Sequence, residues 1–169
     1  MAVVCRAKGL PKVERKSLGL GGPAHPTNLN LGCAPPWTYA YDFLMPIGSE
    51  IVAVRGGTVA FVREEFTDAD KGLEQGYVVV IDHGDGTFAG YGHITHEGVL
   101  VEQGEQVAQG ESLARSGNSG ASTIPHLHFQ VSPCLEAETC GSLPITFRNT
   151  RANPTGLALS QEYEALPLH

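Results

Sequence analysis

Short apolar runs separated by turn residues recur through the middle of the chain. Residues 77–81 form a continuous β-branched run, which is typical of a buried strand. The turn at 82–86 separates this run from a returning run at 87–91, as in a hairpin. Further strand-length runs lie at residues 39–43, 50–55, 58–62, 99–107, 111–116, 126–131 and 143–147. No long segment has a helical period, and only the tail at 159–166 suggests a short helical turn. The pattern predicts an all-β fold, either a sandwich of antiparallel sheets or an open barrel.

The size and charge of the chain limit how many domains it can form and which kinds of partner it can bind. With 169 residues and 41% hydrophobic content, we expect a single domain over 1–169, with a core at about 20–150. Residues 1–20 and 150–169 are expected to be peripheral, the first supplying an outer strand. The net charge is −7 and no basic run occurs, which argues against nucleic acid as a partner. No apolar run is long enough to span a bilayer.

The chain has four cysteines, and whether any of them form disulfides depends on whether the cellular compartment is oxidising. They are Cys5, Cys33, Cys134 and Cys140. None forms a CxxC pair, so a zinc site built on thiolates is not expected. Cys134 and Cys140 flank a five-residue loop after a strand, which leaves a disulfide and two unrelated cysteines as alternatives. The N-terminus has no signal-peptide character, so either the chain is cytoplasmic or a leader has been removed.

Two histidines stand one residue apart within the strand-like run at 126–131. Side chains at i and i+2 of a strand share a face, so we expect His126 and His128 to project together while Leu127 and Phe129 enter the core. Imidazole and carboxylate groups are typical zinc ligands, and a hydrolytic zinc site needs three of them plus an open position. Asp42 is the candidate carboxylate; the alternative is that it faces solvent on an edge strand.

Several motifs in the same order resemble the lysostaphin/LytM-type zinc peptidases, over roughly residues 39–131. Residues 39–48 and 52–59 resemble the metal-binding opening of that family. The middle part of the family's sequence pattern is resembled by residues 80–87 and by Tyr91-Gly-His93-Ile. The last part is resembled by 104–110, 116–120 and Pro125-His-Leu-His-Phe129. The resemblance implies a duplicated, all-β peptidase fold with a groove, walled by the loops at 21–38 and 64–75.

The resemblance also assigns roles to individual residues. It implies that Asp42 and His128 bind Zn²⁺, and that His93 and His126 are the two catalytic histidines that do not bind the metal. The third ligand is expected upstream of the aspartate, where His25 is the available histidine, so that residues 26–37 would be an insertion. Which catalytic histidine is the base stays open.

The activity implied by the resemblance is that of a zinc metalloendopeptidase that cleaves peptide bonds in bacterial peptidoglycan cross-links or stems. Its partner is then the peptidoglycan peptide, and its place is the periplasm or the cell wall outside the cell. One alternative is an inactive relative that binds cell wall or regulates a cell-wall hydrolase. A second is a biotinyl- or lipoyl-like carrier, but the hairpin at 82–86 lacks the lysine that a carrier needs.

Overall fold

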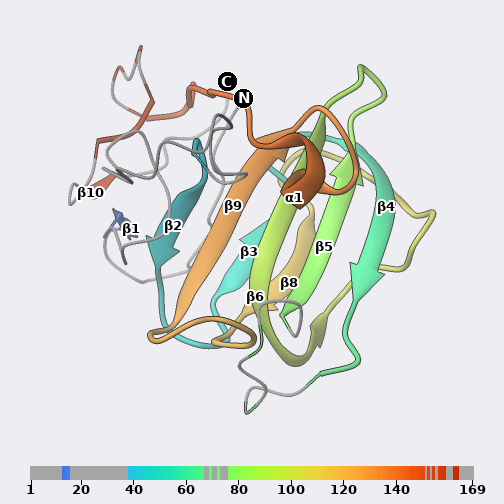
Figure 1. Ribbon diagram of the computed structural model, residues 1–169, viewed down its shortest axis with the longest axis vertical. Helices are drawn as coiled ribbons and strands as arrows, with labels where there is room; N and C mark the ends of the chain where they lie inside the picture. Colours follow the sequence, from blue (N-terminus) through green and yellow to red (C-terminus); the bar gives the residue numbers. More distant parts are fainter. Residues whose placement is uncertain are drawn as a thin grey trace.

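The computed structural model describes residues 13–15, 38–66, 69, 72, 76–150, 152, 154, 156–158 and 162–163. The strands in this part of the chain are β1 (Val13–Arg15), β2 (Tyr41–Leu44), β3 (Glu50–Val52), β4 (Gly57–Arg63), β5 (Tyr77–Asp82), β6 (Phe88–Val99), β7 (Gln106–Val107), β8 (Ser112–Ser116), β9 (His126–Ser132) and β10 (Glu162–Tyr163). Among the described residues the one helix is α1, at Ala137–Cys140. Every strand pairing is antiparallel, which confirms the all-β prediction (Figure 1).

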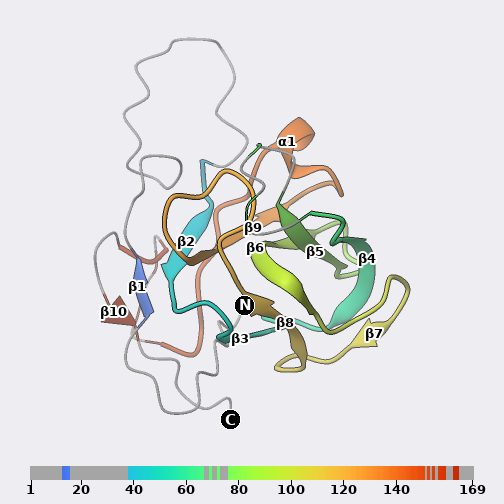
Figure 2. The same ribbon diagram turned by 90° about the horizontal axis from the view of Figure 1, so that it is seen from below.

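The strands follow the order β10-β1-β2-β9-β6-β5-β4-β7, while β3 pairs with β8 and β8 also pairs with β6. Strand β9 therefore lies in the middle of the sheet, between β2 and β6 (Figures 1 and 2). Because these three strands come from distant parts of the sequence, the sheet can gather side chains that are far apart in the chain.

The core is formed by the strand residues that point away from the two-histidine face. Tyr41, Tyr91 and Phe129 are almost fully buried, and the rings of Tyr91 and Phe129 lie 5.2 Å apart. Phe147 packs edge-on against Tyr41, with ring centroids 5.1 Å apart. Burial of this kind stabilises each large apolar side chain by about 1.5–3 kcal/mol, so the core holds the central strands in place.

Three of the predicted elements differ from the structure in extent or type. The run at 99–107 is a strand only at its ends, as the last residue of β6 and as β7. The run at 143–147 is irregular rather than a strand, although Leu143 N donates to Val131 O over 2.7 Å and Phe147 is buried. In the tail, the described residues Glu162–Tyr163 form a strand paired with β1, so the helical turn predicted for 159–166 is wrong there. A strand within residues 1–20 is present as β1, but β10 pairs with its far side, so β1 is not the outer strand expected there.

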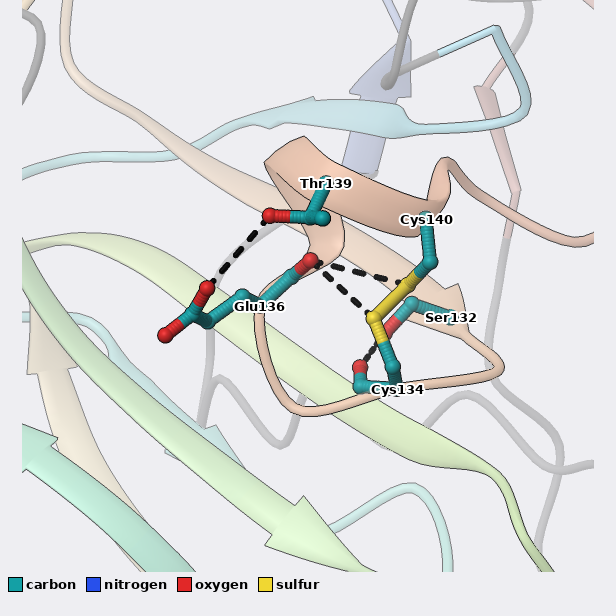
Figure 3. Close-up of a disulfide and its surroundings, with 5 residues drawn as sticks. All are labelled: Ser132, Cys134, Glu136, Thr139 and Cys140. Carbon is teal, nitrogen blue, oxygen red and sulfur yellow. Dashed lines mark hydrogen bonds between the residues drawn. A yellow bond between two sulfur atoms is a disulfide. The ribbon is translucent and has the colours of Figure 1, made fainter.

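A disulfide joins Cys134 to Cys140, with an S–S distance of 2.05 Å (Figure 3). It closes the loop that follows β9 and contains α1, so the disulfide alternative for these two cysteines is confirmed. Cys5 and Cys33 lie outside the described residues, as does the predicted groove wall at 21–38 apart from Thr38. No helix in the described part of the chain is long and apolar enough to cross a membrane.

Candidate active site

Strand β9 alternates as its sequence predicts. Leu127 and Phe129 are buried in the core, with 3% and 1% of their surface exposed. His126 and His128 stand on the opposite face, where the side chain of His128 is partly exposed and His126 is buried. The face with the two histidines is called the site face below.

Asp42 lies directly across from His128, on the neighbouring strand β2. Its Oδ1 is 2.8 Å from Nδ1 of His128 and 3.6 Å from Nε2 of His126. Asp42 is 7% exposed and β2 is paired on both sides, so the alternative of a solvent-facing aspartate on an edge strand is wrong.

The carboxyl group of Asp42 is held in its charged form. Burial by itself raises the pKa of this group, because a low-dielectric surround penalises the charge. The hydrogen bond from His128 and the positive charge that the neighbouring imidazoles can carry outweigh burial, and the pKa falls below its ordinary value of 3.8. An anionic oxygen among imidazole nitrogens is the kind of group that a divalent cation binds.

His93 joins this group through a β-bulge in β6. Tyr77 pairs with Ile94 while Val78 pairs with Gly92, so His93 is the extra residue of the bulge. Its φ of 61° lies in the left-handed region, which residues other than glycine seldom adopt. Bulges redirect side chains near functional sites, and here the ring of His93 comes to 4.4 Å from the ring of His126 and 5.9 Å from that of His128.

Backbone carbonyl groups orient the rings of His93 and His126. Nδ1 of His93 is 2.7 Å from Ser119 O, and Nδ1 of His126 is 2.8 Å from Ile124 O. A carbonyl oxygen only accepts, so each Nδ1 must carry the proton that it donates. Each neutral ring therefore keeps the lone pair on Nε2, the atom needed for a base.

Burial also keeps His93 neutral. Burial lowers the pKa of His93, the neighbouring His126 and His128 lower it further, and the result is about 3 despite the opposing bond to Ser119 and the charge of Asp42. A neutral imidazole that is held by its Nδ1 can accept a proton at Nε2.

The structure brings together four of the five residues predicted for the site. Asp42, His93, His126 and His128 converge on the site face, whereas His25 lies outside the described residues. Among the residues that the structure describes, no group of three His, Cys, Asp or Glu is arranged to hold a metal ion. Asp42 and His128 provide two donor atoms of the kind that zinc prefers, so their chemistry fits the ion and a third ligand must come from elsewhere.

Sequence reasoning missed Ser122 as a supporting residue. Its Oγ lies 3.1 Å from Nδ1 of His126 and 2.7 Å from Oδ1 of Asn118. The hydroxyl thus stands beside the Nδ1 atom that orients His126. A serine four residues before a histidine has no distinctive spacing, because the contact depends on how the loop at 117–125 folds back.

Comparison with known proteins identifies the family. The profile of peptidase family M23 matches residues 37–138, more than half of the chain. The chain belongs to peptidase family M23. All four site residues that the structure brings together lie within the matched range.

Two curated relatives are similar over a 90-residue stretch. An uncharacterised metalloprotease of Buchnera aphidicola is 32% identical over 53% of this chain. The peptidoglycan DD-endopeptidase ShyA of Vibrio cholerae is 34% identical over 53% of it. These matches span only 22% and 19% of the two relatives, which are much longer proteins.

A solved structure supports the M23 fold. A variant of the catalytic domain of the prophage-encoded M23 protein EnpA from Enterococcus faecalis is 23% identical to this chain. The match covers 78% of this chain and 85% of that one, with a TM-score of 0.52. At this level of identity the likeness concerns the fold, and it agrees with the all-β architecture described above.

Proposed function

We propose that this M23 chain is a zinc-dependent endopeptidase that hydrolyses peptide bonds in the cross-links or stems of bacterial peptidoglycan. The observation that carries the proposal is the buried contact of 2.8 Å between Asp42 and His128, with the rings of His93 and His126 beside it. Membership of family M23 supports peptidase chemistry, and the similarity to a peptidoglycan DD-endopeptidase supports the substrate class.

The zinc ligands in this proposal are Oδ1 of Asp42, Nδ1 of His128 and a ring nitrogen of His25. The first two atoms already face each other across β2 and β9, so one ion can replace the proton that they share. When bound, zinc supplies an acidified water and polarises the peptide carbonyl group.

His93 and His126 move the protons. Each ring has its Nδ1 proton committed to a backbone carbonyl, so it can accept a proton only at Nε2. A ring that has accepted this proton becomes a donor at the same atom, either to the leaving amine or to the developing oxyanion. One ring takes the proton first and then passes it on, and the geometry is compatible with either ring in this role. The other ring, while neutral, has no N–H at Nε2 to offer an oxyanion.

The same proposal covers the organisation and location of the chain. Residues 1–169 form a single peptidase domain with its core at about 20–150, and the protein acts in the periplasm or at the cell wall. The Cys134–Cys140 disulfide supports an oxidising compartment, because such bonds are rare in the cytosol.

Zinc content and digestion of purified peptidoglycan test the proposal. Wild-type protein should bind one zinc ion and release new amino termini from peptidoglycan, with activity lost on chelation and restored by zinc. Asp42→Ala and His128→Ala should each lower zinc content and reduce activity by about a thousandfold or more, since a metal supplies several kcal/mol of transition-state stabilisation.

Two further variants complete this test. His25→Ala should behave like the other ligand variants, and retained zinc with full activity would show that this histidine is not a ligand. His96→Ala is the matched control, because its side chain is 54% exposed, its Nε2 lies 3.9 Å from a carboxylate oxygen of Glu97, and it is not among the predicted ligands. Binding of cell wall without zinc or hydrolysis would identify the alternative, an inactive relative, and refute the proposal.

A further inference from the structure

We propose that Gly90 and Gln130 form a subsite that holds the backbone of the substrate peptide beside the metal centre. A peptide N–H donates to Oε1 of Gln130 while the peptide passes over Gly90 of β6. This inference rests on the proposed function, since the ligand is the extended peptide whose bond is cut at the histidines.

Gly90 occupies a position where the fold does not require glycine. Its φ is not in the left-handed region, and an added Cβ would meet only Cγ of Gln130, at an ordinary contact distance of 3.9 Å. By contrast, a Cβ on Gly57 or Gly117 would come within 2.2 and 2.4 Å of backbone atoms. Glycine inside a strand costs roughly 0.5–1 kcal/mol relative to alanine. Glycine inside a strand often marks a place that a ligand approaches closely, and no steric contact among the described residues accounts for glycine at position 90.

Gln130 supplies an independent observation. It lies directly across from Gly90 on β9 and only 8% of it is exposed. Its Oε1 is buried and accepts no hydrogen bond from any residue in the described part of the chain. Leaving a buried carbonyl oxygen without a donor costs about 1–3 kcal/mol. Because the terminal torsion of glutamine is soft, the amide can turn Oε1 towards a donor that arrives above the partly exposed Gly90.

The position of this pair relative to the metal ligands fits an extended peptide. Gln130 follows His128 by two residues on the site face of β9, a rise of roughly 6.6 Å. An extended substrate has the same spacing between its alternate residues. A peptide that runs along β6 with its scissile bond at the histidines therefore brings its backbone to Gln130 two residues away. The missing side chain at the partly exposed Gly90 leaves room for it there.

Two substitutions separate this role from a structural one. Gly90→Ala should leave the free energy of unfolding unchanged or raise it by removing glycine, and should leave zinc content unchanged. Gln130→Met keeps the length of the side chain and removes the unpaired oxygen, so it should not destabilise the fold either. Both should raise KM for a defined cross-linked stem peptide by about three- to tenfold, the equivalent of one hydrogen bond, with a smaller change in kcat.

The matched control is Gln106→Met on the edge strand β7, which should leave KM as in wild type. Unchanged KM in both site variants would overturn the inference, and so would a loss of stability that accounts for the loss of activity. Affinity for the same stem peptide is also measured by calorimetric titration. Hydrolysis by the wild type tests the proposed function, whereas the ratio of peptide affinities between variants and wild type tests the subsite even if no bond is cut.

Discussion

The two faces of strand β9 show how one strand can serve both stability and chemistry. Towards the core, Leu127, Phe129 and Val131 are 3%, 1% and 0% exposed, and they pack against other apolar side chains. On the site face, the alternate residues His126, His128 and Gln130 are polar, and Oε1 of Gln130 has no hydrogen-bond partner among the described residues. The core face is complete by itself, whereas the site face offers atoms that a ligand can use.

Strand β6 shows the same contrast along its length. Tyr91 is fully buried, and its hydroxyl oxygen accepts a hydrogen bond from Val54 N over 2.9 Å. Two residues later the backbone of His93 is left-handed, a conformation that costs roughly 1–3 kcal/mol and persists only when its surroundings enforce it. The core packing around Tyr91 thus holds in place the bulge that directs His93 to the site.

Among substitutions that test the difference between the two faces of β9, Phe129→Ala is expected to have the largest effect, on the free energy of unfolding. Removing this ring should lower the free energy of unfolding by about 3–5 kcal/mol, because a cavity forms between Tyr91 and Phe147, whose rings lie 5.2 and 6.4 Å away. The measurement is urea unfolding followed by circular dichroism. Gln130→Met, at the next residue and on the opposite face, is the control and should show no loss. Equal losses of unfolding free energy at both positions would mean that the site face contributes as much to stability as the core face does.

The core face of β9 could be predicted from the sequence, and so could the pairing of its histidines on one side. Both follow from the two-residue period of a strand, which is a local property. That Asp42 meets His128 required the resemblance to a known family, because the sequence does not specify which strands become neighbours. The strand predicted at 143–147 is wrong. An apolar run can be buried by side-chain packing alone, as Phe147 is against Tyr41, without its backbone forming a strand.

The bulge at His93 could not be predicted. Nothing in Tyr91-Gly-His93-Ile signals a left-handed histidine, and alternation along β6 would turn this side chain away from Gly92 and the site face. The conformation depends on tertiary contacts, among them the bond from Nδ1 of His93 to Ser119 O, 26 residues away in sequence. The role of Ser122 and the unpaired oxygen of Gln130 likewise exist only once the chain has folded.

A smaller effect is expected from Ser122→Ala, which tests how much the site face depends on its supporting loop. The hydroxyl of Ser122 is one of two acceptors near Nδ1 of His126, and Ile124 O remains after the substitution. We therefore expect kcat to fall only about three- to tenfold, the equivalent of one hydrogen bond, with KM unchanged. Nitrogen NMR of the imidazoles would show whether His126 keeps its proton on Nδ1.

Ser49→Ala is the control for Ser122→Ala. The hydroxyl of Ser49 also donates to a backbone carbonyl, that of Pro46, over 2.7 Å. Its loss should not change kcat. If both serine variants reduce kcat alike, the effect of Ser122→Ala reports a general loosening of loops rather than orientation of His126.

The smallest effect is expected at Asp85, which contrasts with Asp42 because both carboxyl groups have a lowered pKa for different reasons. Hydrogen bonds from Thr87 and Arg55 lower the pKa of Asp85 to about 2 in an exposed hairpin, whereas imidazoles act on the buried Asp42. The folded-state pKa of Asp85 is below its ordinary value of 3.8, so its stabilising contribution is complete above about pH 4 and is lost as the pH falls from there through about 2. Thermal unfolding should therefore show a small loss of melting temperature in Asp85→Asn at pH 7 and a smaller loss at pH 2, where about half of the folded-state carboxyl groups are already protonated. Added salt should shrink the part of this loss that is due to Arg55, because exposed charges are screened. A loss that is the same at both pH values would show that the carboxylate charge of Asp85 does not stabilise the hairpin.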